Sequence, residues 1–254
     1  MNLLLDFGNT RLKWAVSSGE AVANAQTHIL RRGACFYTAE ALAEWGAEMA
    51  LHSDLRALQF SSVVSAEREA AVFAQTAPLG LTPHRFTVSG RSGTLTNAYA
   101  SPETLGVDRW AAAIGGWGLC GVSCLIISAG TATTIDVVQA GGDGDQAVYR
   151  GGLILPGVDL MLDALHAGTA RLPRAVGCYR GAPDVPDNTH DAMTTGALDA
   201  TCGAIERMGR VLPAEAPWIL TGGAAGSIAQ ALGDRVRCVA DLVLEGLALD
   251  LDDR

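Results

Sequence analysis

An aspartate, a glycine, two further polar residues and a lysine stand together at the end of an apolar run, in LLLDFGNTRLK (3–13). Leu3 to Leu5 predict a buried strand, and Asp6 places a carboxylate where that strand leaves the core. Carboxylates bind hard cations such as Mg²⁺, directly or through water. Lys13 would bring a compact positive charge to phosphates. It is the only lysine beside 17 arginines. The alternative is that the chain prefers arginine to lysine throughout and that a lysine remains at position 13 by chance.

The same pattern occurs again 122 residues later. LLLDFGNTRLKWAV (3–16) is echoed by LIISAGTATTIDVV (125–138), with an apolar strand, a polar residue, a glycine, a turn and a second strand. Gly8 and Gly130 would let backbone amides and the hydroxyls of Thr10 and Thr131 approach phosphate oxygens. Two copies predict two related domains that face each other and bind one polyphosphate. Either turn alone also fits an ordinary Asx or hairpin turn.

Apolar runs alternate with helical stretches along the chain, which indicates an α/β fold. We expect strands at 58–65 and 124–131, and helices at 39–52 and 191–212. Residues 133–155 predict a strand, a glycine-rich turn and two further strands. The echo predicts one domain at 1–115 with the first phosphate turn and another at 116–254 with the second.

Composition limits the classes of function. The 254 residues are 49% hydrophobic and can bury one large or two modest cores. A net charge of −9 without Lys/Arg clusters argues against nucleic-acid binding. The six cysteines form neither a zinc pattern nor a dense disulfide scaffold. MNLLLDFG reaches an aspartate too soon for a signal peptide or membrane span. We expect a cytoplasmic protein that acts on a small substrate.

Five motifs in fixed order resemble those of type III pantothenate kinase: DFGNTRLKW (6–14), GVDRW (106–110), GTATTID (130–136), GGLILPG (151–157) and NTHDAMTTG (188–196). That family belongs to the superfamily of acetate and sugar kinases, heat-shock ATPases and actin. The resemblance implies two RNase H-like domains, each a mixed β-sheet flanked by helices, with the active site in the cleft between them.

The resemblance also implies a reaction. The γ-phosphoryl group of ATP, bound with Mg²⁺ at Asp6, is transferred to the primary hydroxyl of pantothenate. This is the first step of coenzyme A synthesis. The resemblance further implies that the enzyme is a homodimer. Asp108 is the implied proton acceptor. The implied ATP contacts are Asp6, Phe7, Gly8, Asn9, Thr10, Arg11, Leu12, Lys13 and Thr131. The implied pantothenate contacts are Tyr99, Gly106, Val107, Asp108, Arg109 and Thr189.

These roles suit the chemistry of GVDRW. A primary alcohol is a poor nucleophile, so a nearby carboxylate such as Asp108 must take its proton as the bond to phosphorus forms. Arg109 would bind the pantothenate carboxylate through two parallel hydrogen bonds. The alternative is a plain helix start, with Asp108 favoured by the helix dipole and Arg109 a solvated surface charge.

One position departs from the family pattern. In many members the strand before GTA ends in an aspartate associated with a monovalent cation, usually potassium, whereas this chain has Ser128. A hydroxyl is a weaker cation ligand than a carboxylate. We therefore expect dependence on K⁺ or NH₄⁺ to be weak or absent.

A further glycine-rich segment, ILTGGAAGS (219–227), follows a predicted strand and precedes a predicted helix. Kinases of this superfamily hold the nucleoside of ATP at such a place. Crowding of the backbone at the glycines is the alternative explanation.

Two other classes of function remain beside an active kinase. A non-catalytic regulator could use the same fold, but the intact Asp6 and Asp108 argue against it. A different phosphotransferase or phosphatase of the superfamily would not require Tyr99 and GVDRW, which match the pantothenate pocket.

Overall fold

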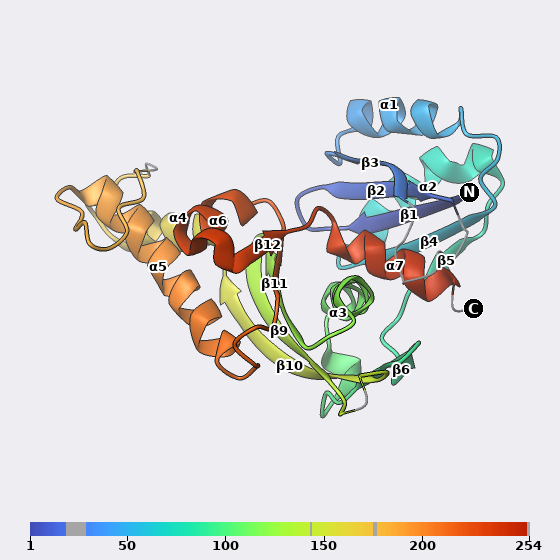
Figure 1. Ribbon diagram of the computed structural model, residues 1–254. Coiled ribbons are helices and arrows are strands. Elements are labelled where there is room, and N and C mark those ends of the chain that lie inside the picture. The colour runs from blue at the N-terminus through green and yellow to red at the C-terminus, as the bar shows by residue number, and fades with distance from the viewer. Residues whose placement is uncertain (19–28, 143, 175–176, 253–254) are drawn as a thin grey trace. The chain divides into compact units, whose positions relative to one another are not determined.

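The computed structural model describes residues 1–18, 29–142, 144–174 and 177–252 (Figure 1). The chain divides into two compact units. Unit 1 comprises Met1–Gly121, Gly141–Tyr149 and Asp241–Arg254, and unit 2 comprises Val122–Ala140 and Arg150–Ala240. The contact-based units therefore do not coincide with the domains expected at 1–115 and 116–254, and that division stays a prediction.

Unit 1 is built on a mixed five-stranded sheet with the order β3-β2-β1-β4-β5. Strands β1 and β2 form an antiparallel hairpin, β3 pairs antiparallel with β2, and β4 and β5 continue the sheet in parallel beyond β1. The bounds are Asn2–Phe7 for β1, Leu12–Ser17 for β2, Ile29–Cys35 for β3, Ala57–Ser62 for β4 and Pro83–Arg85 for β5.

Helices cover both faces of this sheet (Figure 1). On one face, α1 (Ala39–Met49) and α2 (Ala66–Thr76) bury apolar residues against alternate residues of β1 and β2. On the other, α3 (Val107–Cys120) contacts β4, and α7 (Leu242–Asp252) contacts β1, β2 and β4. Helices α3 and α7 cross closely at Gly115 and Gly246, where a Cβ atom on either would lie within 2.4 Å of a backbone oxygen.

Unit 2 repeats the same strand order. Its sheet runs β12-β11-β8-β9-β10, with β8 and β9 antiparallel and β11 and β12 parallel beyond β8. The bounds are Cys124–Ala129 for β8, Ala132–Ala140 for β9, Ala147–Pro156 for β10, Trp218–Thr221 for β11 and Val236–Cys238 for β12. The first three residues of β10 belong to unit 1, where they pair with β7 (Leu95–Asn97), which pairs in turn with β6 (Arg91–Ser92).

Three helices cover one face of the unit 2 sheet: α4 (Val158–Gly168), α5 (Thr189–Gly209) and α6 (Ala225–Leu232). Alternate residues of β8, such as Leu125 and Ile127, point into this core, as do Ile135 and Val137 of β9. The other residues of these strands therefore point to the opposite face. In both units, each sheet is mixed and flanked by helices, as expected from the sequence.

The two hairpins differ in loop length. Phe7 pairs with Leu12 across four residues, whereas Ala129 pairs with Thr133 across three. The offset of 122 holds for the first strands, but the shorter loop reduces it by one for the second strands. The partner of Asp6 is Lys13, and the partner of Ser128 is Thr134. A charged cross-strand pair in unit 1 is thus replaced by a pair of hydroxyls in unit 2.

The expected meander at 133–155 is partly wrong. Residues 133–140 form most of β9, but the two further strands are a single strand, β10, of ten residues. Gly151 lies within it at φ 93°, a conformation that glycine adopts without steric cost. The glycine pair at 151–152 therefore lies inside β10 and does not end it. Asp143 lies outside the described residues.

Candidate functional site

The first turn places Asp6 inside unit 1 and not at its surface. Asp6 is the penultimate residue of β1, is 8% exposed, and its Oδ1 accepts a hydrogen bond from the Ser61 hydroxyl at 3.0 Å. Burial raises the pKa of Asp6 to about 6; the charge of Lys13 and the Ser61 hydrogen bond lower the pKa, and the charges of Asp108 and Asp241 raise it. Asp6 thus lies where a bound cation would compensate its charge.

Lys13 lies opposite Asp6 in the hairpin, so both side chains point to the same face of the sheet. Its ammonium forms an ion pair with Asp241, at 3.2 Å between Nζ and Oδ1. Asp241 directly precedes α7, far from Lys13 along the chain, and no motif in the sequence marks it. The lysine is therefore held at the site by a partner that the motif does not contain.

Two further side chains hold the loop between β1 and β2. The Tyr37 hydroxyl donates to the carbonyl oxygen of Gly8 at 2.9 Å, and Arg68 Nη1 donates to the carbonyl oxygen of Asn9 at 2.8 Å. The Arg68 guanidinium also lies 5.1 Å from the centre of the Tyr37 ring. Carbonyl oxygens would repel phosphate. Because Tyr37 and Arg68 bind these two carbonyl oxygens, the loop is favoured to present its backbone amides to a phosphate.

The GVDRW motif begins α3. Asp108 lies in the first turn of that helix, and its Oδ1 accepts from the backbone N–H of Arg109 at 2.9 Å. Arg109 is 5% exposed, with its guanidinium 5.7 Å from the centre of the Tyr99 ring. The helix-start interpretation thus holds for the position of Asp108, but a solvated surface charge does not describe Arg109. Tyr99, Asp108 and Arg109 lie in one unit with Asp6 and Lys13.

The second turn lies in unit 2. Thr131 is exposed at the tip of the β8–β9 hairpin, and its carbonyl oxygen accepts from Gly157 N at 2.9 Å. Gly157 belongs to the GGLILPG motif, and a Cβ there would lie 2.3 Å from the Gly130 oxygen. Gly157 of this motif is therefore explained by close packing under the turn.

Three hydroxyls lie in register beside this turn. Ser128 of β8 pairs with Thr134 of β9 and with Thr221 of β11, so all three point to the face opposite the helices. Thr134 and Thr221 are 8% and 4% exposed, and their buried Oγ1 atoms have no hydrogen-bond partner within the described chain. In unit 1 the equivalent positions beside Asp6 are occupied by Lys13, which corresponds to Thr134, and by Ser61, which corresponds to Thr221.

Backbone crowding explains the first glycine of the segment 219–227. Gly222 has φ 106°, and a Cβ there would lie 2.2 Å from the Ala129 oxygen, which also accepts from Ala224 N at 3.1 Å. The backbone conformation and close packing therefore explain a glycine at 222 without a role in nucleoside binding.

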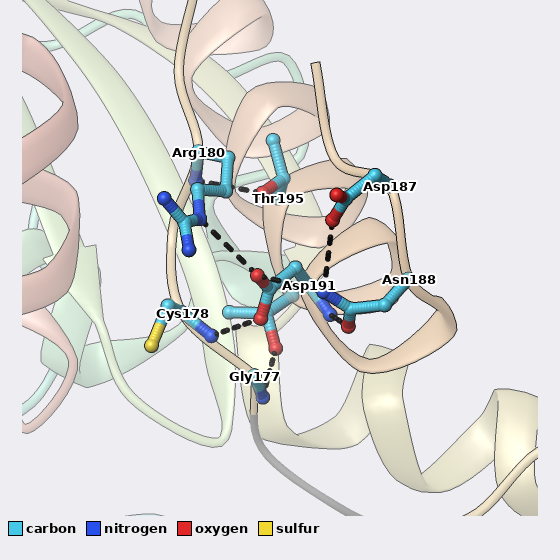
Figure 2. A network of polar contacts seen from close by, with 8 residues as sticks. Gly177, Cys178, Arg180, Asp187, Asn188, Asp191 and Thr195 are labelled. Carbon is cyan, nitrogen blue, oxygen red and sulfur yellow. Dashed lines mark hydrogen bonds and ion pairs between the residues drawn. The ribbon is translucent and has the colours of Figure 1, made fainter. Parts of the chain in front are cut away.

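The NTHDAMTTG motif forms the start of α5 and a polar network around Asp191 (Figure 2). The Asp191 carboxylate accepts from Cys178 N at 2.7 Å, from Asn188 Nδ2 at 3.0 Å and from Arg180 Nε at 3.2 Å. The Cys178 amide, then Asn188 and Arg180, hold the pKa of Asp191 below its usual range against the opposing effect of burial.

This network fixes residues 177–180 to the helix. Thr194 and Thr195 accept from Gly177 N at 2.8 Å and from Arg180 N at 2.9 Å. Thr189, the expected pantothenate contact, is the first residue of α5 and is exposed. It lies in unit 2, whereas the other expected pantothenate contacts lie in unit 1.

Within the part of the chain that the structure describes, no three His, Cys, Asp or Glu side chains gather as a metal site. A divalent ion at Asp6 would therefore take its other ligands from water and phosphate, as Mg²⁺ commonly does. None of the helices among these residues is long and apolar enough to cross a membrane.

Sequence comparison identifies the family. Residues 2–210 match the type III pantothenate kinase family. A type III pantothenate kinase of Aromatoleum aromaticum is 42% identical over 252 residues, covering 98% of this chain and 97% of the relative. One from Dechloromonas aromatica is 38% identical over 254 residues, covering 97% of each.

A solved structure shows the same fold at much lower identity. It is the activator of the 2-hydroxyisocaproyl-CoA dehydratase from Clostridium difficile with bound ADPNP, with a TM-score of 0.53 and 10% identity, covering 99% of this chain and 94% of that chain. That likeness concerns the fold, whereas the family follows from the matched family model and from the near-complete coverage of the relatives above. The chain belongs to the type III pantothenate kinase family, the ATP-dependent kinases of pantothenate in coenzyme A biosynthesis.

Proposed function

We propose that this chain transfers the γ-phosphoryl group of ATP to pantothenate with Asp108 as the general base. The observation that carries the proposal is the arrangement in unit 1, where the charge of Asp108 raises the pKa of buried Asp6 and the Arg109 guanidinium lies 5.7 Å from the centre of the Tyr99 ring. Most of the proposed phosphate and acceptor contacts thus belong to one compact unit, whereas Thr131 and Thr189 belong to unit 2.

In the proposed step, the pantothenate hydroxyl attacks the γ-phosphorus and its proton passes to the Asp108 carboxylate. The new O–P bond forms as the bond from γ-phosphorus to the β–γ bridging oxygen breaks, and ADP leaves. Arg109 orients pantothenate by pairing with its carboxylate. Tyr99, Gly106, Val107 and Thr189 are proposed to complete the substrate contacts.

Mg²⁺ is proposed to lie at Asp6, bound directly or through water. The buried carboxylate accepts a side-chain hydrogen bond from the neutral Ser61 hydroxyl, and such a carboxylate fits a cation. When bound, Mg²⁺ supplies charge neutralisation on the phosphates. The proposed phosphate contacts are residues Phe7 to Lys13, namely Phe7, Gly8, Asn9, Thr10, Arg11, Leu12 and Lys13, together with Thr131.

Assembly and location stay predictions. A homodimer is implied by the family resemblance. Ile154, Leu160 and Leu165 of unit 2 are 64%, 47% and 40% exposed, and a dimer contact would give such apolar side chains a partner. A cytoplasmic location is proposed from the cysteine content, which fits a reducing compartment.

An ATP-consumption assay with and without pantothenate tests the function. We expect ADP to form only when pantothenate and Mg²⁺ are both present, together with 4′-phosphopantothenate detected by mass. No turnover in correctly folded protein would favour the non-catalytic regulator. Turnover with other alcohols but not pantothenate would favour a different phosphotransferase.

The monovalent-cation site of the family fits this chain poorly. Ser128 provides a hydroxyl where many relatives have a carboxylate, and its neighbours Thr134 and Thr221 add only neutral oxygens. These buried hydroxyls can solvate a cation but do not supply the charge that attracts one. We propose that K⁺ or NH₄⁺ is either unnecessary or needed at much higher concentration than in relatives with aspartate.

We therefore expect the initial rate to depend weakly on K⁺, and Ser128→Asp to strengthen that dependence. The measurement is initial rate against K⁺ at constant ionic strength, balanced with a bulky organic cation. A wild-type rate that is negligible without K⁺ and saturates at low millimolar levels would refute the prediction. Backbone carbonyls or another carboxylate such as Asp136 would then supply the site.

A further inference from the structure

Asp241 has an unusual backbone conformation. Its φ is 51°, the only positive value at a non-glycine residue in the described ranges. Aspartate tolerates this left-handed region better than most residues, but such conformations persist only where the surroundings enforce them, and they concentrate at functional sites. The chain also passes from unit 2 to unit 1 between Ala240 and Asp241.

A rigid element fixes the position of Asp241. Its carbonyl oxygen accepts from Leu244 N at 2.9 Å and from Glu245 N at 3.3 Å, which begins α7. Leu242, Leu244 and Leu247 of that helix are fully buried. The carboxylate of Asp241 therefore projects from an anchored helix start and not from a loose loop.

That carboxylate contacts the phosphate motif and not its own helix. Within the described chain, its partner is the Lys13 ammonium, at 3.2 Å. A helix-capping carboxylate would instead accept from the first amides of α7. The two side chains are 29% and 21% exposed, so the pair is only partly screened by water. Lys13 in turn lies opposite Asp6 across the hairpin.

We propose that Asp241 is a positioning residue that holds the Lys13 ammonium beside Asp6, ready for the phosphates of ATP. This inference rests on the proposed role of residues 6–13 in binding ATP. A lysine side chain has four rotatable bonds, and ordering it costs affinity when it happens only on binding. Asp241 orders Lys13 in advance, so its contribution belongs to nucleotide affinity and not to proton transfer.

The expected effect of Asp241→Asn is a rise of about 3- to 10-fold in the KM for ATP, the cost of ordering one long side chain. Asparagine keeps the size and tolerates the left-handed conformation, but loses the charge. We expect kcat and the KM for pantothenate to change less than twofold. If Asp241 only started the helix, its substitution would not change the KM for ATP selectively.

Asp241→Gly separates positioning from backbone conformation. Glycine adopts a positive φ freely, so we expect a melting temperature near that of the wild type together with the same rise in KM for ATP. Should Asp241→Asn fold poorly, this variant carries the test. Glu245→Gln is the matched control, because Glu245 is a carboxylate of the same helix whose ion pair, to Arg32 at 3.3 Å, lies outside the phosphate motif. We expect its KM for ATP to equal that of the wild type.

Calorimetric binding of a non-hydrolysable ATP analogue with Mg²⁺, in wild type and in a Lys13→Met background, completes the experiment. We expect Asp241→Asn to weaken binding about 3- to 10-fold in the wild type and not at all beside Lys13→Met. Equal affinities of wild type and Asp241→Asn, or an equal loss in both backgrounds, would overturn the role of Asp241 alone. A wild-type protein that binds no nucleotide would overturn the proposed function and this inference with it.

Discussion

Asp108→Asn is expected to lower kcat by at least about 10²-fold, the lower end of typical general-base contributions. Asparagine cannot accept the pantothenate proton. It keeps the side-chain oxygen that accepts from the Arg109 N–H at the start of α3, so the local fold should persist. The loss of a favourable charge at a helix N-terminus costs only about 0.3–1 kcal/mol of stability.

Steady-state rates with saturating ATP and pantothenate provide the measurement, and circular dichroism verifies the fold. Asp159→Asn is the matched control, since Asp159 also lies in the first turn of a helix, α4, and has no proposed role in the reaction. It should retain wild-type turnover. Near wild-type kcat in folded Asp108→Asn would remove Asp108 from the base role.

Asp6→Ala is expected to abolish Mg²⁺-dependent turnover of ATP while pantothenate still binds. Alanine removes the buried carboxylate that would hold the ion, whereas the expected acceptor contacts at Tyr99 and Arg109 lie on other elements. Turnover across a Mg²⁺ titration and calorimetric binding of pantothenate test the two halves separately. Full activity throughout the titration would mean that the metal site lies elsewhere.

The same carboxylate should make the metal-free protein less stable. Burial raises the pKa of Asp6 from 3.8 to about 6, so folding favours its protonated form, and the wild type loses stability as pH rises from about 4 to about 6. Asp6→Asn, which keeps an acceptor for Ser61, should therefore be more stable by on the order of 2 to 3 kcal/mol at pH 8 and about equal near pH 4. Urea unfolding with a chelator at both pH values would reveal the difference, and a wild type that is as stable as the variant at pH 8 would contradict it.

Local sequence was enough to predict the α/β class and the hairpin that carries Asp6 and Lys13. A strand, a glycine-containing turn and a second strand are signals within 15 residues, and their repetition at 125–138 predicted the second sheet. Register across the turn was less predictable, because it depends on one residue of loop length that apolar periodicity does not reveal.

The partners of the motif could not be predicted in the same way. Tyr37, Arg68 and Asp241 act on the first turn, but each comes from a separate element and has no fixed spacing from it. The residues that flank them in the sequence form no motif that would predict these contacts. The left-handed conformation of Asp241 is likewise imposed by packing of α7 and has no glycine to signal it. The proposed roles of the site residues stay predictions.

The return of the chain to unit 1 at Asp241 has a consequence for synthesis on the ribosome. The five-stranded sheet of unit 1 is complete once residue 85 has emerged, but α7, which contacts β1, β2 and β4, is translated only after residue 241. Until then part of one sheet face lacks its cover, and Lys13 lacks its carboxylate partner. A nascent or prematurely terminated chain that already carries every family motif would therefore still have an unfinished nucleotide site and an apolar face open to chaperones.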